Sequence, residues 1–247
     1  MCNKLTLKEI ENTTNEFYSY FCGVDISKVK QGIHFVCSPE RDMELKGFGC
    51  KYMLYIFVKD DVCIVSYSPK YKESIDKLRQ CNIGEILRLL NQEVKLKKMQ
   101  LMIFAEEKVK AYGEAKVLEE ADYPLYEVFF RKTFPKANPK GWLFEYFIEK
   151  AAKGYFTGYI VNDALVSVCD APDMPYMEDI IQHTGIQTLK DERRKGYAKC
   201  TAALAAHHLI GKGVCPQWEC RVDNIASIEL AQSIGYQKYG TAYILEG

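Results

Sequence analysis

Residues 187–198 read Q-T-L-K-D-E-R-R-K-G-Y-A, and this stretch decides the fold. An apolar-alternating strand gives way to a charged turn, and Arg193, Gly196 and Ala198 follow at the spacing R-x-x-G-x-A where a helix begins. The first N–H groups of a helix are unpaired and carry a positive partial charge, so they bind anions such as phosphate. Gly196 lets the backbone approach a ligand closely. The pattern predicts an anion-binding loop; the alternative is a basic turn that only closes a helix.

A second stretch, N-I-A-S-I-E-L-A-Q-S-I-G-Y at residues 224–236, follows a strand that we expect over 214–221. Together the two stretches resemble the GNAT superfamily of acetyl-CoA-dependent N-acyltransferases. In that family R-x-x-G-x-A is the pyrophosphate loop, and N-x-x-S with a helix ending in G-Y is a second characteristic block. With C-P-Q-W at residues 215–218 between them, they resemble one bacterial subgroup of uncharacterised GNAT proteins. The resemblance covers residues 112–247.

The resemblance implies the GNAT acyl-CoA N-acyltransferase fold, a mixed α/β fold whose mostly antiparallel sheet is flanked by helices. Strands separated by helices, with hairpins on one side, fit that class. We expect a GNAT domain over residues 111–247 and an extra N-terminal α+β domain over residues 1–110. The charged boundary at 106–116 lacks the Pro, Gly and Ser of a flexible tether, so the two parts are expected to pack together. The predicted elements include a helix over 6–21, hairpins over 52–67 and 156–170, strands over 99–105 and 178–189, helices over 197–211 and 224–234, and a last hairpin over 236–245.

The two predicted hairpins have similar layouts. Y-I-F-V-K-D-D-V-C-I-V-S-Y-S at residues 55–68 and G-Y-I-V-N-D-A-L-V-S-V-C-D at residues 158–170 both run strand, short Asx turn, strand. The N-terminal half is therefore either a degenerate GNAT-like unit or a domain with an ordinary hairpin. It contains no R-x-x-G-x-G/A loop, so we do not expect it to bind a nucleotide in the same way. Whether this half mediates the formation of a homodimer also stays open.

Coenzyme A is the co-substrate that the resemblance implies, and acetyl-CoA is the expected acyl donor. The backbone of the loop would bind the pyrophosphate, the end of the preceding strand would splay away and pair with the pantetheine arm, and the turn before the next helix would contact the pantetheine. Asn224 is also a good helix N-cap, and Ser227 can bond locally, so both have a purely structural alternative. The residues assigned to coenzyme A are Ile186, Gln187, Thr188, Arg193, Arg194, Lys195, Gly196, Tyr197, Ala198, Asn224 and Ser227.

The general base is less well marked. Many GNAT enzymes use a carboxylate, often through water, to deprotonate the amine, and Glu178 and His183 precede the loop on the predicted central strand. For Glu178 the alternative is a solvated charge at a strand end, and for His183 it is a core-edge histidine with a backbone partner. Many family members carry a tyrosine that protonates the leaving thiolate, and the matching position here is Ala231.

Composition excludes several other classes. The 247 residues carry 33 basic and 33 acidic side chains, for a formal net charge of +0, which argues against a general nucleic-acid or membrane-surface binder. We expect no signal peptide and no membrane span. Ten scattered cysteines without a C-x-x-C motif suggest reduced thiols in a cytoplasmic protein, and their spacing fits no metal template.

Two functions from different classes follow. The first is an N-acyltransferase that moves an acetyl or other acyl group from the coenzyme A thioester to an amine of a small molecule or peptide by direct transfer. The alternative is a non-catalytic GNAT-fold protein that binds coenzyme A as a sensor or interaction module, which Ala231 and the unassigned base motivate. The acceptor's identity would depend on the variable segments at 122–154 and 170–178 and on the N-terminal domain.

Overall fold

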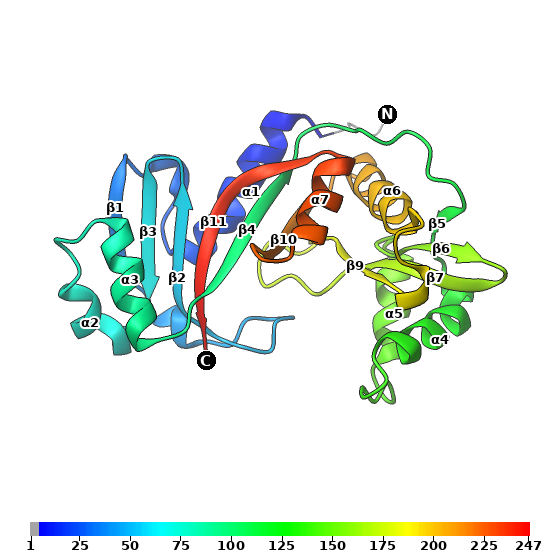
Figure 1. Ribbon diagram of the computed structural model, residues 1–247, viewed down its shortest axis with the longest axis horizontal. Coiled ribbons are helices and arrows are strands. Elements are labelled where there is room, and N and C mark those ends of the chain that lie inside the picture. The colour runs from blue at the N-terminus through cyan, green and yellow to red at the C-terminus, as the bar shows by residue number, and fades with distance from the viewer. Residues whose placement is uncertain (1–4) are drawn as a thin grey trace.

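The computed structural model describes residues 5–247, which form seven α-helices and eleven β-strands in two sheets (Figure 1). The mixed α/β class with a mostly antiparallel sheet flanked by helices is confirmed. The helices are α1 (Leu7–Cys22), α2 (Lys72–Asp76), α3 (Ile83–Glu93), α4 (Tyr123–Thr133), α5 (Leu143–Ala152), α6 (Tyr197–Gly211) and α7 (Ile225–Ile234). Within residues 5–247, no helix combines the length and apolar character needed to cross a bilayer.

The larger sheet has seven strands and joins the two halves of the chain. Its outermost pairs, β1 with β3 and β10 with β8, are parallel, and the other neighbours are antiparallel. In spatial order the strands are β1 (Gly32–Cys37), β3 (Val62–Tyr67), β2 (Tyr52–Lys59), β11 (Tyr236–Glu246), β4 (Lys97–Phe104), β10 (Cys215–Arg221) and β8 (Ile181–His183). The smaller sheet is antiparallel and contains β5 (Ala115–Val117), β6 (Thr157–Val161), β7 (Ala164–Asp170) and β9 (Gly185–Thr188).

Strand β4 lies between β10 and β11, although more than a hundred residues of sequence separate it from either of them. The predicted last hairpin over 236–245 is wrong, because β11 is one strand of 11 residues that pairs with both β4 and β2. Gly240 sits at a bulge where its backbone approaches the carbonyl oxygen of Val58. A glycine within a strand often marks such a bulge or close approach. Figure 1 shows β4 and β11 running side by side through the centre of the molecule.

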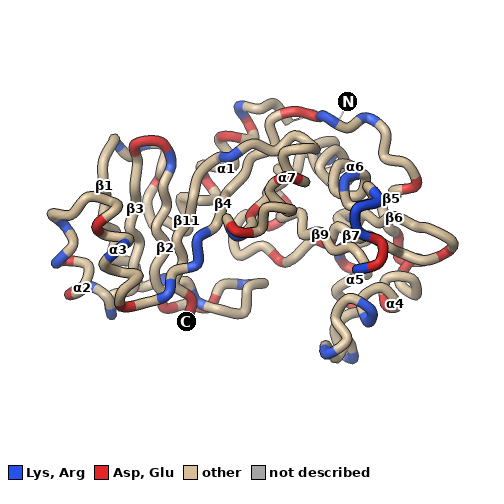
Figure 2. Tube along the Cα trace, viewed as in Figure 1, with Lys and Arg blue, Asp and Glu red and all other residues tan. Residues whose placement is uncertain are grey.

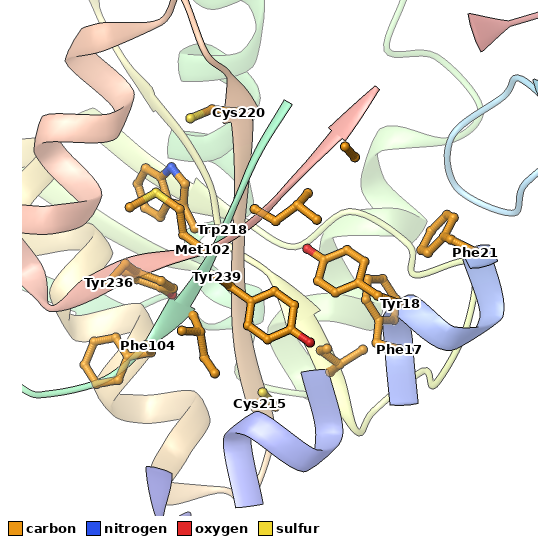
Figure 3. Close-up of a cluster of buried hydrophobic side chains, with 14 of the residues drawn as sticks. Phe17, Tyr18, Phe21, Met102, Phe104, Cys215, Trp218, Cys220, Tyr236 and Tyr239 are labelled. Atoms are coloured by element: carbon orange, nitrogen blue, oxygen red, sulfur yellow. The ribbon is translucent and has the colours of Figure 1, made fainter. Parts of the chain in front are cut away.

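Helix α1 covers one face of the large sheet, and α7 packs on the opposite face. A capping box begins α1, with Thr6 and Glu9 each bonding the backbone of the other. On the α1 face, the amide of Gln217 donates to the Thr14 hydroxyl at 2.7 Å, and Tyr18 stacks on Tyr239. On the other face Trp218 donates to Ser227 of α7. Figure 3 shows Tyr18 and Tyr239 on the α1 side and Trp218 and Tyr236 on the other.

The small sheet is sandwiched between α4 and α5 on one face and α6 on the other. The aromatic rings of Tyr126, Phe147 and Phe156 form the core beneath α4 and α5. On the opposite face the Thr157 hydroxyl donates to a carbonyl of α6. The hairpin of β6 and β7 turns at Asn162 and Asp163, which both have positive φ, as expected for a type I′ turn.

The turn from α7 into β11 depends on Gly235. Its φ is +121°, and a Cβ there would collide with the carbonyl oxygen of Glu106, which lies beside it because the amide of Ala105 donates to Gly235. We expect Gly235→Ala to reduce the free energy of unfolding by about 2–4 kcal/mol. Gly213→Ala, with φ of +76° and open space around its Cβ position, is the matched control and should cost about 1–2 kcal/mol. Urea unfolding of both variants measures the difference, and equal losses would contradict the steric argument.

Candidate active site

The predicted strand over 178–189 is divided at Thr184 into two strands that belong to different sheets. Strand β8 runs parallel to β10, with His183 opposite Gln217. Thr184 makes the last contacts with β10: its backbone N–H and its hydroxyl both donate to the carbonyl oxygen of Gln217, each at 3.0 Å. From Gly185 onward the chain becomes β9 and pairs with β7 instead. The splay that the sequence predicts therefore begins at Thr184.

Strand β9 forms the edge of the small sheet on the side of this splay. An edge strand presents backbone N–H and C=O groups that a ligand can pair with. Ile186, Gln187 and Thr188, the residues assigned to the pantetheine arm, make up this edge strand with Gly185. The side chain of Thr188 is already engaged, since its hydroxyl shares a 2.8 Å hydrogen bond with Ser167. Any contact of Thr188 with an extended ligand would therefore come from its backbone.

The loop after β9 leads into α6 in the conformation that an anion-binding turn needs. Gly196 is the N-cap of α6, has φ of +88° and makes no side-chain capping bond. The first N–H groups of α6 thus lack the capping partner that most helices use. Nothing lies within 4 Å of the position that a Gly196 Cβ would take, so the space in front of this helix end is open. The Tyr197 ring packs at a tilt against the Tyr159 ring, with centroids 4.5 Å apart, and Ala198 is partly buried in the first turn.

Three cations lie in this loop, and Figure 2 shows them as a run of basic residues at the beginning of α6. Arg193 donates to the carbonyl oxygen of Thr188 at 3.2 Å and so ties the loop to the end of β9. Lys195 pairs with Glu192 at 2.9 Å. Arg194 adopts a positive φ of 63°, which is uncommon for a residue other than glycine. The positive charge at the helix N-terminus is therefore increased by side chains that the loop itself holds.

Asn224 and Ser227 have the local roles that their structural alternative describes. Asn224 is the N-cap of α7, and its side chain accepts a hydrogen bond from the Ser227 N–H at 3.3 Å. The Ser227 hydroxyl accepts from Trp218. Ala231, at the position of the family's tyrosine, is completely buried in α7. A contact with coenzyme A stays a prediction for both polar residues.

Glu178 lies before β8, at the end of the strand away from the splay. Its carboxylate pairs with Lys46 at 2.5 Å and with Lys153 at 3.6 Å. The hydrogen bond from Lys46 lowers the pKa of Glu178 below its ordinary value. A carboxylate held ionised by two lysines is a weak base, so its surroundings favour the structural alternative.

His183 lies at the splay, on the α1 face of the sheet. Its ring packs edge-on against Phe17 and Phe48, and its buried Nε2 atom has no hydrogen-bond partner among residues 5–247. Burial lowers the pKa of His183 to about 4. The structural alternative for His183 requires a backbone hydrogen-bond partner, and Nε2 has none among the described residues. The imidazole is neutral at pH 7. His183 can accept a proton there, although its basicity is low.

Glu219 is the residue that the sequence interpretation missed. It follows Gln217 by two positions on β10, so it lies on the same α1 face, just beyond the last contact with β8. Its side chain is partly buried, and no residue within 5–247 makes a hydrogen bond or ion pair with it. Burial raises the pKa of Glu219 to about 7. A carboxylate with this pKa is suited to accept and release a proton near neutral pH.

Asp170 is a second partly buried carboxylate near the splay. It lies opposite Gly185 on β7, and a Cβ on Gly185 would collide with its Oδ1 atom. Burial raises the pKa of Asp170 to about 7 as well. Asp170 stands one strand away from the splay, whereas Glu219 is on the strand that borders it. Perturbed carboxylates of this kind are candidates for proton transfer.

An aromatic layer formed by Tyr18, Phe21, Tyr52 and Tyr55 lies near Glu219. Burial, with a contribution from the nearby Glu219 carboxylate, raises the pKa values of Tyr18, Tyr52 and Tyr55. Tyr52 stacks on Tyr55 with ring centroids 6.1 Å apart, and the buried Tyr55 hydroxyl has no partner among the described residues. Phe21 contacts both rings. All of these rings belong to the N-terminal half, so this half forms one wall of the site.

One signal in the sequence points to Glu219. The strand C-P-Q-W-E-C-R carries a glutamate at its interior, where a charge is costly unless it has a function or a partner. The aspartate ending A-L-V-S-V-C-D has no such signal, because strand ends are commonly polar. Within residues 5–247, no group of three or more His, Cys, Asp or Glu side chains is arranged to hold a metal ion.

Comparisons with known proteins agree with this architecture. A sequence model of the family described as GNAT acetyltransferase matches residues 55–244. The structure is similar to that of a GNAT-family acetyltransferase from Colwellia psychrerythraea, with a TM-score of 0.53, 12% identity, and coverage of 78% of this chain and 81% of that chain. It is also similar to a GCN5-related N-acetyltransferase from Sphaerobacter thermophilus, with a TM-score of 0.51, 14% identity, and coverage of 67% and 56%. At these identities the similarity shows the fold alone. No curated protein sequence matches the chain.

Two sheets that splay apart beside an uncapped, basic helix N-terminus define an acyl-CoA N-acyltransferase fold, and this fold class is confirmed by the solved structures. The chain belongs to the GNAT acetyltransferase family, since the family model matches more than half of it. That match begins in β2 and ends in β11, so it includes strands from both halves of the large sheet.

Proposed function

We propose that this protein transfers an acyl group, in the simplest case acetyl, from a coenzyme A thioester to an amine of a small molecule or peptide. The observation that carries the proposal is the splay between β9 and β10, with an uncapped helix N-terminus at one end and the partnerless carboxylate of Glu219 beside it. The first feature suits the phosphates of coenzyme A. The second suits an amine that must lose a proton.

Coenzyme A would lie along the splay in this proposal. The N–H groups from Arg193 to Ala198 would bind the pyrophosphate, and Arg194 would add charge without an ion pair of its own among the described residues. The pantetheine arm would pair with the edge of β9 from Ile186 to Thr188. This arrangement would place the thioester near Thr184, where the two strands diverge.

The reaction needs a proton acceptor and a leaving thiolate. A protonated amine R–NH₃⁺ loses one proton to become a nucleophile, its nitrogen attacks the thioester carbon, and the C–S bond breaks. The products are the amide, coenzyme A thiol and one released proton. We assign the acceptor role to Glu219, with His183 and Asp170 as the neighbouring groups that could serve instead. Ala231 cannot protonate the thiolate. The hydroxyl of Tyr236 shares a hydrogen bond of 3.2 Å with Thr184, where the strands diverge, so Tyr236 is the phenol that would protonate the thiolate in its place.

The pH dependence of kcat separates the two partly buried carboxylates from His183 and Glu178. With Glu219 or Asp170 as the base, kcat should rise with pH and level off above an apparent pKa of about 7. With His183 the rise should be centred at about pH 4, and with Glu178, whose pKa is lowered, it should also lie in the acid range. The measurement is kcat at saturating amine from pH 5 to 9 by thiol release. A profile that is flat from pH 5 to 9 would contradict both carboxylates.

The first experiment is a calorimetric titration with acetyl-CoA, coenzyme A and adenosine 3′,5′-bisphosphate, followed by an amine screen that detects thiol release. Saturable one-to-one binding of acetyl-CoA and release of thiol with at least one amine is the expected result. The second candidate function, a coenzyme A-binding protein without turnover, is favoured by the buried Ala231. Binding without thiol release across the whole panel would support it, and absence of binding would overturn both.

A further inference from the structure

The side chain of Arg41 is buried without a counter-ion. Arg41 lies in the short 3₁₀ helix Pro39–Asp42 and is 1% exposed. Its Nε and Nη1 atoms have no hydrogen-bond partner among residues 5–247, and Nη2 makes only a long contact of 3.4 Å with the Tyr176 hydroxyl. The neighbouring Asp42 is not its partner, because that carboxylate binds Ser68 and Lys70.

A buried guanidinium without a protein partner can be neutralised by an anionic ligand. Arginine is a permanent cation in folded proteins, so a buried guanidinium needs a negative or hydrogen-bonding partner. A buried charge without a partner destabilises the folded protein. Proteins retain such groups when a ligand supplies the missing charge, as at active sites.

Arg41 belongs to the same aromatic layer as Glu219. Burial raises the pKa values of Tyr52 and Tyr176, and the nearby charge of Arg41 partly opposes this rise. The Glu219 carboxylate also raises the pKa of Tyr52. Phe21 packs edge-on against Tyr176 at 5.1 Å and contacts Tyr52 at 5.9 Å. The layer therefore contains both a cation and a carboxylate.

The same layer reaches the splay through Phe48. The Phe48 ring packs edge-on against Tyr52, with centroids 5.8 Å apart, and against His183 at 6.2 Å. The side chains between Arg41 and His183 therefore contact one another through their aromatic rings. An acceptor bound here would carry a negative charge for Arg41 and an apolar side chain for the rings.

We propose that the acyl acceptor is an amino acid, or a compound of the same type, whose carboxylate binds Arg41 and whose amine faces Glu219. This inference rests on the proposed function and adds the substrate class to it. A carboxylate suits the site better than a phosphate, because one guanidinium neutralises one negative charge and the remaining surroundings are aromatic. The partnerless hydroxyl of Tyr55 offers a further hydrogen bond to the same substrate. The apolar body of the amino acid packs on the rings of Phe21, Phe48 and Tyr52.

The test compares each amino acid with the amine that lacks its carboxylate. The probes are L-phenylalanine against phenethylamine, L-methionine against 3-(methylthio)propylamine and L-leucine against isopentylamine, all with acetyl-CoA as donor. For at least one pair, kcat/KM should be on the order of 10- to 100-fold higher for the amino acid, which is the range expected of a charge-assisted hydrogen bond. Equal values within every pair would overturn the proposal.

Two variants assign the preference to Arg41. Arg41→Met should bring the amino acid and its matching amine to similar kcat/KM values, whereas Arg41→Lys should keep part of the preference. Arg79→Met is the control, because Arg79 pairs with Asp76 on the surface of the N-terminal half. Affinity for coenzyme A reports folding and should stay unchanged in all three. If Arg41→Met does not fold, the comparison rests on Arg41→Lys, and an undiminished preference in that variant would count against Arg41.

The outcomes separate this inference from the proposed function. Transfer to simple amines without any preference would leave acyl transfer standing and remove the role of Arg41. Absence of acetyl-CoA binding would remove the proposed function itself. If acetyl-CoA binds but no thiol is released, calorimetric titration of the three amino acids in the presence of coenzyme A decides the matter. Failure of all three to bind would then overturn the assignment of Arg41.

Discussion

Replacing Glu219 with glutamine is expected to lower kcat for acyl transfer by roughly 100- to 10,000-fold, the range that general bases contribute. The amide has the same shape as the carboxylate but cannot accept the proton that the attacking ammonium must lose. Affinity for acetyl-CoA should stay unchanged, because Glu219 faces the aromatic layer and not the basic loop. Steady-state kinetics and calorimetry on the same preparation measure both quantities.

The stability of Glu219→Gln provides an independent readout. The folded-state pKa of Glu219 is raised to about 7, above the ordinary value of about 4.3. The folded protein therefore binds more protons than the unfolded chain between these values, and this contribution to stability is lost as the pH rises through about 7. Glutamine removes that loss, so the variant should be more stable than the wild type at pH 8, and its advantage should shrink by pH 5. Urea unfolding at both pH values measures the effect.

Two other variants complete this experiment. Glu229→Gln changes an exposed glutamate on α7 and should leave kcat and stability as they are. Asp170→Asn tests the second carboxylate. Full activity in Glu219→Gln together with a large loss in Asp170→Asn would transfer the role of base to Asp170.

Replacing Gly196 with glutamate is expected to weaken coenzyme A binding by on the order of 100-fold or more. Because the Cβ position of Gly196 is open, the new side chain fits sterically, and its carboxylate occupies the space in front of the helix N-terminus. There it takes the place of the phosphates and repels them, and the φ of +88° adds strain. Calorimetric titration with coenzyme A measures the change.

The chain contains a close control for this substitution at the other end of α6. Gly213 has φ of +76° and nothing within 4 Å of its Cβ position, so Gly213→Glu introduces the same charge and a similar backbone strain. It lies beyond the C-terminus of α6, away from the predicted phosphate site. Its affinity for coenzyme A should match that of the wild type. Equal losses in both variants, or none in either, would mean that the loop is not the pyrophosphate site.

Local sequence rules predicted the elements that local physics controls. The turn at Asn162 and Asp163 forms because these residues tolerate positive φ, and α1 begins at Thr6 because its side chain and that of Glu9 satisfy each other's backbone groups. The strand, glycine turn and helix ending at Gly211 follow from the same kind of information. The family could be predicted in the same way, since each of its two motifs lies within a short stretch of sequence.

The pairing of distant strands could not be predicted in this way. Nothing in Met99 to Phe104 indicates that this strand enters between β10 and β11, because pairing depends on which edges remain open once the rest of the sheet has formed. The predicted last hairpin was wrong for the same reason. Strand β11 pairs with β4 on one side and with β2 on the other, so the chain continues through Gly240 as one strand and does not fold back on itself.

The sequence by itself determined the family, the basic loop before α6 and the strand that splays from β10. These features are local, since each depends on residues that lie next to one another in the chain. Only the tertiary structure decided the surroundings of Glu219, Asp170 and Arg41. Burial shifts the pKa of the two carboxylates and leaves the guanidinium without a counter-ion, and burial depends on which remote helices and strands pack around a side chain.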